Sequence, residues 1–306
     1  MSLRSKVWPP VAAAAIVSAA AVLGVIWYRG RPISTAAMLK RLPSTDALIL
    51  AVDFDALRNA GILQLLDGSK AGEDPDYRRF VHDINFDYRR DLDAAYVAFG
   101  PDGTYMLVRG RFDWKSLHAY VKQQGGSCVN ALCKMRGSGP QRQISFFELQ
   151  AGVMGLAVSP EGLAARRLQQ EPSGSNPEIP GDPVWLSVPT SFLRSGQLPE
   201  GTHMFARSIE RAERVTLALS AAGSQLTARL DVRCHTGQEA EDIASQLTQA
   251  TIKLREMIQR EHQTPNPADL SGVLSSGSFR SEGRRVIGSW PIDRRFVENV
   301  LGGGLP

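Results

Sequence analysis

The sequence has few cysteines and histidines, the residues on which most metal sites and many nucleophilic active sites depend. Three of its 306 residues are cysteine and five are histidine, and the histidines are scattered without the paired spacing of metal ligands. The Walker loop, the Gly-x-Ser-x-Gly turn of hydrolases and the His-Glu-x-x-His motif of metalloproteases are all missing. We therefore expect no cofactor and no metal, and the sequence favours a protein that is not an enzyme.

The sequence also lacks an excess of charge outside its N-terminal segment. Lysine and arginine together number 35, and aspartate and glutamate number 31. Because Arg4, Lys6, Arg29 and Arg31 flank the apolar N-terminal segment, the other 31 basic residues match the 31 acidic ones over residues 32–306. A neutral body lacks the broad positive field on which binding to a phosphate backbone depends. We therefore expect no nucleic-acid partner.

Long apolar runs are confined to the N-terminus. Residues 11–28 form an uncharged run of 18 residues between basic flanks, at the short end of the length that spans a bilayer. Its C-terminal end, residues 25–29, is bulky and lacks the small residues that signal peptidase needs, so an uncleaved signal anchor is favoured over a cleaved signal peptide. Basic residues are nearly balanced on the two sides, but the short N-terminal tail favours a single-pass protein of the cell membrane with an extracytoplasmic body.

Two stretches of sequence about 120 residues apart each predict a β-hairpin followed by a capped helix. The predicted strands are residues 94–99 and 104–111 in the first stretch, and residues 214–219 and 225–232 in the second. Asp113 is the expected cap of the first helix, and Thr236 caps a longer helix that extends to about His262. An internal duplication would explain the repeated order.

Further matches extend the predicted duplication to both ends of each half. Apolar strands are expected at residues 47–52 and 184–188, and helices begin near Pro160 and Pro291. We predict an α+β fold with an N-terminal transmembrane helix, followed by two related halves that each have an antiparallel sheet packed against helices. The expected segments are the anchor at residues 1–31, the first half at 32–170, a linker at 171–182 and the second half at 183–306.

A short charged string occurs twice before the first hairpin. Asp76-Tyr77-Arg78-Arg79 recurs eleven residues later as Asp87-Tyr88-Arg89-Arg90. Eleven residues are close to three helical turns, so an unbroken helix would place both arginine pairs on one face, where Arg78, Arg79, Arg89 and Arg90 could contact an anion. The favoured interpretation is instead a helix that ends at residues 85–87 and carries ordinary solvated charges.

Cys128 and Cys133 are separated by four residues and predict a disulfide in an exported body. A redox site more often has the Cys-x-x-Cys spacing, and a zinc site needs further ligands that the neighbouring sequence does not supply. Cys234 precedes a helix cap that could activate a thiol, but no base or orienting group is evident. We expect Cys234 to be a structural residue at the end of a strand.

Three segments carry a resemblance to a known group of proteins. They are Leu42-Pro43-Ser44-Thr45-Asp46-Ala47, Asn85-Phe86-Asp87 through Asp91-Leu92-Asp93, and Arg109-Gly110-Arg111-Phe112-Asp113. Over residues 42–168 the chain resembles bacterial membrane-anchored extracytoplasmic proteins of unknown function. The resemblance implies export and fold, and it brings no activity and no catalytic residue.

These features together favour a non-catalytic binding or scaffolding module of the cell envelope. Its expected partners are the membrane, through the N-terminal helix, and another envelope protein. One alternative is a carrier of a lipid or other apolar ligand, which would need a large cavity between the sheet and the long helix. A second alternative is a hydrolase with an unrecognised site, which would need polar groups with perturbed pKa values in one cleft.

Overall fold

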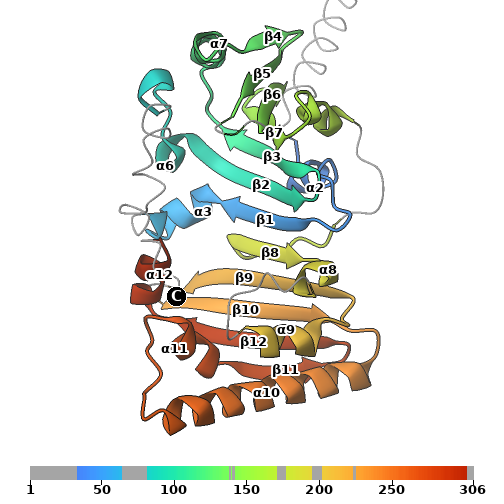
Figure 1. Cartoon of the computed structure of the whole chain (residues 1–306), viewed down its shortest axis with the longest axis vertical. Coiled ribbons are helices and arrows are strands. Elements are labelled where there is room, and N and C mark those ends of the chain that lie inside the picture. Colours follow the sequence, from blue (N-terminus) through green and yellow to red (C-terminus); the bar gives the residue numbers. More distant parts are fainter. Residues whose placement is uncertain are drawn as a thin grey trace, which may run out of the picture. The chain divides into compact units, whose positions relative to one another are not determined.

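The structure is a computed structural model that describes residues 33–63, 81–137, 139, 142–170, 177–194, 202–222 and 225–301. The twelve strands of this part of the chain form one antiparallel sheet (Figure 1). In chain order the strands are β1 Leu48–Asp53, β2 Leu92–Gly100, β3 Gly103–Gly110, β4 Ser127–Val129, β5 Leu132–Arg136, β6 Gln143–Gln150, β7 Val153–Ser159, β8 Val184–Val188, β9 Arg214–Ala222, β10 Gln225–Arg233, β11 Ser278–Glu282 and β12 Arg285–Ile292. Their spatial order is β11-β12-β10-β9-β8-β1-β2-β3-β7-β6-β5-β4.

The helices whose bounds the structure describes connect or flank these strands along the chain. They are α2 Thr35–Leu39, α3 Phe54–Asn59, α6 Tyr88–Asp91, α7 Trp114–Gln123, the 3-10 helix η2 Ala164–Gln169, α8 Thr190–Leu193, α9 His203–Ile209, α10 Gly237–Arg260, α11 Leu270–Ser275 and α12 Arg294–Leu301. Both predicted caps are confirmed. The carboxylate of Asp113 accepts a hydrogen bond from the backbone N–H of Lys115 at 3.0 Å, and the hydroxyl of Thr236 accepts one from that of Glu239 at 3.1 Å.

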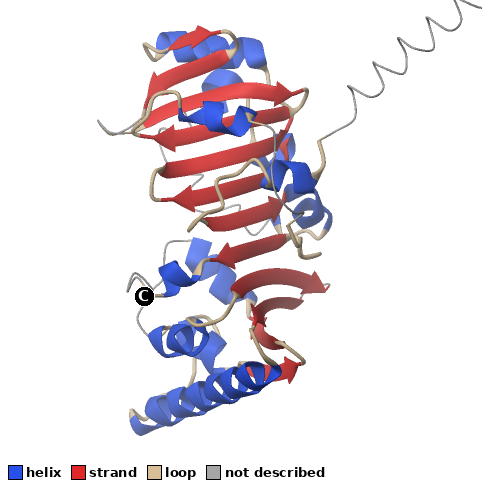
Figure 2. Cartoon of the chain, turned by 90° about the vertical axis from the view of Figure 1, so that its right-hand side faces the viewer, coloured by secondary structure: helices blue, strands red, loops and turns tan. Residues whose placement is uncertain are grey.

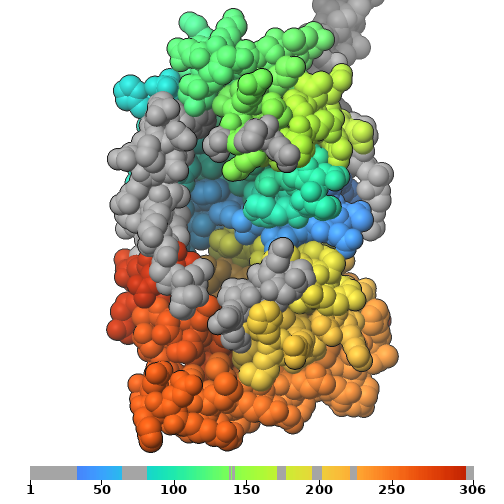
Figure 3. All heavy atoms as spheres, viewed as in Figure 1, coloured from blue at the N-terminus to red at the C-terminus, as the bar shows by residue number. Residues whose placement is uncertain are grey.

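The two halves of the sheet share one strand order. The order β1-β2-β3-β7-β6 in the first half recurs as β8-β9-β10-β12-β11 in the second. The halves are joined because β1 pairs with β8, with Leu50 opposite Leu186 and Ile49 opposite Ser187. Figure 3 shows the blue start of the first half in direct contact with the yellow start of the second.

The predicted fold class is therefore wrong in treating each half as a sheet of its own, since every described strand belongs to one continuous sheet. The sequence predicts a strand buried on both faces at residues 47–52 and its counterpart at residues 184–188, but no local pattern indicates that the two pair. Two antiparallel edge strands that pair satisfy backbone groups which would otherwise be exposed. The pairing is the physical reason why the two halves share a sheet.

The prediction of a membrane protein with a transmembrane signal anchor is also contradicted. Among the described residues, every helix is too short or too polar to cross a membrane. The segment assigned to the anchor, residues 11–28, lies outside the described residues. The longest described helix, α10, is amphipathic, and its apolar side packs against strands of the second half (Figure 2).

The strand register assigns every side chain to one of two faces, because neighbouring partners in a sheet point the same way. One row of partners crosses the sheet and includes Cys133, Phe146, Leu156, Met106, Val97, Leu50, Leu186, Leu217 and Leu230. Leu117 of α7 packs in the cluster of Cys133, and Leu247 of α10 packs in the cluster of Leu230. Both long helices therefore cover this face, which we call the helix face.

The opposite face, which we call the second face, differs between the halves. In the first half η2 covers it, and Arg167 of η2 lies 5.8 Å from the ring centre of the buried Tyr105. The helix that was predicted to correspond to η2 is α12, but Phe296 and Val297 of α12 pack with the cluster on the helix face. The predicted match between the helices near Pro160 and Pro291 is therefore wrong, since the two lie on opposite faces of the sheet.

The account of the core predicts a large difference between two truncations in α10. Leu247 is 1% exposed and Ile252 is 46% exposed. Leu247→Ala should lower the free energy of unfolding by about 3 kcal/mol, because it removes buried methyl groups and leaves a cavity. Ile252→Ala, measured by the same denaturant titration, should lower it by less than about 1 kcal/mol. Equal losses would contradict the packing of α10 described above.

Candidate functional site

The predicted anion site around the repeated Asp-Tyr-Arg-Arg string does not form as an unbroken helix. Asn85 has a φ of 52°, a left-handed conformation that ends the helical turn over residues 81–84 before α6 begins at Tyr88. Arg78 and Arg79 lie outside the described residues. The favoured interpretation, a helix that ends at residues 85–87, is therefore confirmed, and the continuous face needed for an anion site is not formed.

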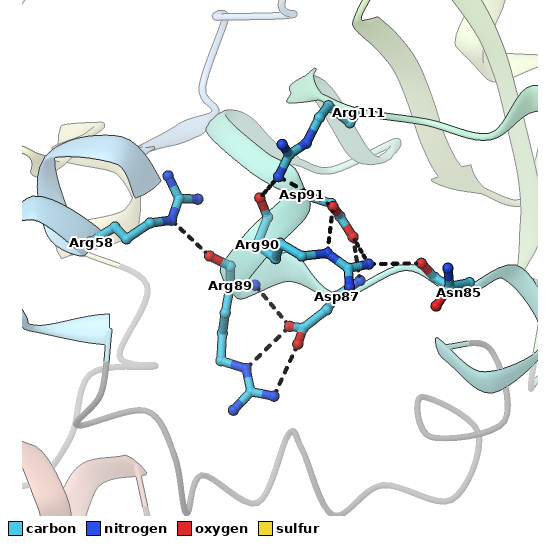
Figure 4. Close-up of polar contacts among 7 residues, drawn as sticks. All are labelled: Arg58, Asn85, Asp87, Arg89, Arg90, Asp91 and Arg111. Carbon is cyan, nitrogen blue, oxygen red and sulfur yellow. Dashed lines mark hydrogen bonds and ion pairs between the residues drawn. The ribbon is translucent and has the colours of Figure 1, made fainter.

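Arg89 and Arg90 are each paired with a neighbouring carboxylate (Figure 4). Arg89 donates to both oxygens of Asp87, from Nε at 3.1 Å and from Nη2 at 3.0 Å. Arg90 donates to both oxygens of Asp91, from Nε at 2.9 Å and from Nη2 at 2.7 Å. Two-point pairing of this kind occupies the planar fork of each guanidinium. In this conformation both arginines therefore form ion pairs within the α6 turn.

The same carboxylates and backbone groups connect the α6 turn to α3 and to Arg111, which directly follows β3. The backbone N–H of Asp87 donates to Asp91 Oδ2 at 2.9 Å, and Arg111 Nη2 lies 3.4 Å from Asp91 Oδ1. Arg58 of α3 donates from Nε to the carbonyl of Arg89 at 2.8 Å. A hydrogen bond from Arg90 to Asp91 lowers the pKa of the Asp91 carboxyl, and one from Arg89 lowers the pKa of Asp87. Both carboxyls are therefore ionised at neutral pH, and their ion pairs hold the α6 turn in place. We call Asp87, Arg89, Arg90, Asp91 and Arg111 the clamp.

The two cysteines of the predicted disulfide lie opposite each other on the hairpin of β4 and β5, with a sulfur-to-sulfur distance of 2.01 Å. His118 of α7 lies over them, and its ring offers a nitrogen within 4.8 Å of both sulfurs. The third cysteine, Cys234, is buried, and desolvation raises the pKa of its thiol to about 11. Cys234 is thus protonated and inert at neutral pH.

A row of three arginines crosses the second face of the second half. In the register of the sheet, Arg233 of β10 lies directly between Arg214 of β9 and Arg285 of β12. These side chains are 38–45% exposed. Arg229, four residues before Arg233 on β10, points to the same face. We call Arg214, Arg233 and Arg285 the arginine row.

Carboxylates from two sources neutralise part of this charge. Glu178 Oε2 lies 3.3 Å from Arg214 Nη1 and 3.0 Å from Arg233 Nη2, so one carboxylate serves two arginines. Asp231 pairs with Arg285 from within the sheet. Glu178 belongs to residues 177–183, a segment without regular secondary structure that borders a pocket of about 260 Å³ together with the arginine row. The pocket is a candidate site for an external carboxylate or phosphate.

Sequence reasoning missed the arginine row because its members lie 19 and 52 residues apart along the chain. The signal was present within β10, where Thr227, Arg229, Asp231 and Arg233 are polar and alternate with the apolar Leu226, Leu230 and Val232. Such alternation indicates one solvated face. The register with β9 and β12, which brings the other arginines alongside, is set by long-range pairing and is not readable from the sequence.

Comparisons with known proteins show a distant structural similarity and no match in sequence. No family model and no curated protein matches the sequence. Crystal forms I and III of TP0453 align with TM-scores of 0.49 and 0.48 and 11% identity, each covering 88% of this chain and 98% of that chain. Crystal form IV aligns with a TM-score of 0.45 and 11% identity, covering 86% of this chain and 95% of that chain. These values assign no function, and the family resemblance over residues 42–168 stays a prediction.

The clamp around α6 predicts a pH-dependent loss of stability. The folded-state pKa of Asp91 is lowered, so its contribution is complete above the unfolded-state value of about 3.9 and is lost as the pH falls through the lower folded-state value. Asp91→Asn should lower the free energy of unfolding by about 1–2 kcal/mol at neutral pH, and the difference from wild type should shrink below pH ~4.

The control for this measurement is Asp102→Asn. Asp102 is paired with Arg167, but its side chain is 71% exposed, so the change should cost less than about 1 kcal/mol at any pH. Denaturant titrations of both variants at neutral and acidic pH check the prediction. A loss for Asp91→Asn that stays constant across this range would contradict the clamp.

The cysteine pair predicts a bond that contributes little stability. Closing so short a loop adds about 2 kcal/mol at best by chain entropy, so replacement of Cys128 and Cys133 by alanine should leave a folded protein. Peptide mapping without reductant should find the two cysteines in one cross-linked fragment. Recovery of both as free thiols from protein isolated without reductant would reject the bond.

Proposed function

We propose that this chain is a non-catalytic binding module whose arginine row holds a carboxylate from an acidic segment of a partner protein. The observation that carries the proposal is the direct juxtaposition of Arg214, Arg233 and Arg285 on adjacent strands. Like charges directly opposite each other in a sheet are destabilising. Their presence on an accessible face, with one carboxylate shared between two of them, supports a role in anion binding.

Glu178 indicates what kind of occupant the row accepts. Its carboxylate reaches Arg214 and Arg233 from a stretch of chain that has no regular hydrogen-bonded structure. Asp182, in the same stretch, lies 3.7 Å from Arg229. An acidic peptide segment thus already fits across this face, and a partner segment with similar spacing would bind by displacing it. Residues 177–183 then act as an internal competitor.

The charge balance favours a protein partner over nucleic acid. Residues 32–306 carry no net formal charge, so the row is a local basic feature without a broad field around it. The lining of the pocket is also mixed, since Glu178, Asp182 and Asp231 lie among its arginines. Such a surface recognises a few defined carboxylates through charge-assisted hydrogen bonds.

Carriage of a lipid, the first alternative from the sequence, is less well supported. It needs space between the sheet and α10, but Ile243 and Leu247 of α10 pack in one cluster with Leu230 and Val232 of β10. The apolar side of the helix is thus used for the core. We further propose that the module works outside the cytoplasm, in an oxidising compartment where the Cys128 and Cys133 pair would be stable as a disulfide.

The proposal predicts opposite effects of two substitutions at the row. Affinity for a short fluorescent oligoglutamate peptide should fall about tenfold or more in Arg233→Ala, because one charge-assisted pair is lost. Glu178→Gln should raise the affinity, because it removes the internal competitor while leaving the arginines in place. Arg260→Ala on α10, whose side chain is 79% exposed, is the matched control and should have no effect.

Fluorescence anisotropy at low and moderate salt checks these outcomes, with oligoglutamine as the uncharged probe. Equal binding of oligoglutamine, or the same loss in Arg260→Ala as in Arg233→Ala, would contradict the proposal. Tighter binding of a single-stranded oligonucleotide than of oligoglutamate would also contradict it and would replace the protein partner with nucleic acid.

A further inference from the structure

We propose that His118, Cys128 and Cys133 form a binding site for a thiophilic metal ion such as Zn²⁺ when the cysteine pair is reduced. The ligand atoms of the three side chains lie within 4.8 Å of one another. Zn–S bonds of about 2.3 Å at a tetrahedral angle place two sulfurs about 3.8 Å apart. The sulfurs are 2.01 Å apart in the disulfide, so after reduction both cysteine side chains rotate to separate them. The same residues would therefore have two states, a disulfide and a metal site.

Backbone geometry fixes the relative positions of the two sulfurs. Asn130 and Ala131 have φ values of 50° and 64°, as in the tight two-residue turns that connect hairpin strands. This turn places Cys128 directly opposite Cys133, so both side chains project to the same face of the hairpin. Breaking the bond between the sulfurs leaves this arrangement in place, because the backbone pairing holds it.

His118 reaches the sulfurs from a separate element. It lies on α7, which packs against β4 and β5, and its ring centre is 6.4 Å from that of Trp114. Cys133 is fully buried and belongs to a cluster with Leu117 and Val121 of the same helix. A site with an apolar wall on one side and half-exposed ligands on the other is shielded and still reachable by an ion.

The site forms in two steps, reduction of the disulfide and then binding of the metal ion. A dithiol reductant donates two electrons and two protons to the disulfide, which leaves two cysteine thiols and converts the reductant to its own disulfide. Binding of Zn²⁺ then releases one proton from each thiol, because the thiolate is the ligand. His118 binds through a neutral ring nitrogen, and the fourth position of the tetrahedron remains for water or another small ligand.

The test uses the full chain with Cys234→Ala, so that Cys128 and Cys133 supply the only thiols. After reduction by a phosphine and its removal without oxygen, Co²⁺ as a probe for Zn²⁺ should bind one ion per chain with a thiolate-to-cobalt charge-transfer band. The oxidised protein should show no band. His118→Ala should weaken binding by at least the roughly 10- to 100-fold that loss of an outer-shell partner costs. His82→Ala, with a side chain 89% exposed, is the matched control.

A second measurement on the chain with all three ligands does not depend on how the His118 variant folds. Zn²⁺ should slow alkylation of Cys128 and Cys133 together, as mapped by peptide. Equal alkylation rates with and without Zn²⁺ would overturn the site and leave a disulfide alone. Binding of Co²⁺ that is unchanged in a folded His118→Ala variant would overturn the role of His118.

Discussion

Hydrogen bonding between β1 and β8 is the interaction on which the rest of the structure depends. It merges the strands of both halves into one sheet, with Leu50 opposite Leu186. Because side chains alternate between faces, this one register decides which residues of the second half share a face with those of the first. A slip of one residue would turn the second half over, so that α10 and the arginine row would each lie on the other face relative to α7.

The two faces of the sheet are used differently along its length. On the helix face, α7 and α10 both supply apolar side chains, and each half has its own cluster of buried residues. On the second face, the row of partners that contains Tyr105 and Ala157 in the first half continues into Thr216 and Asp231 in the second. A repeated strand order thus carries a buried surface in one half and a charged one in the other. The difference explains why α12 packs on the helix face whereas η2 covers the second face.

Local features were predictable because they depend on neighbouring residues. The strand at Val184–Val188, the hairpin of β9 and β10 and the caps at Asp113 and Thr236 all follow from short-range patterns, and the structure has each of them. The pairing of β1 with β8 was missed because antiparallel pairing between distant strands leaves no local trace. Near α6, the end of the helix at residues 85–87 was predictable from local signals, whereas the two-point pairing of Arg90 with Asp91 was not.

We propose that Glu178 occupies the place of a partner carboxylate on the arginine row. A crystal structure of the chain with bound oligoglutamate tests it most directly. The account predicts a peptide carboxylate within hydrogen-bonding distance of Arg214 and Arg233, with Glu178 displaced from both. A structure in which Glu178 still contacts both arginines, while the peptide lies elsewhere, would contradict it.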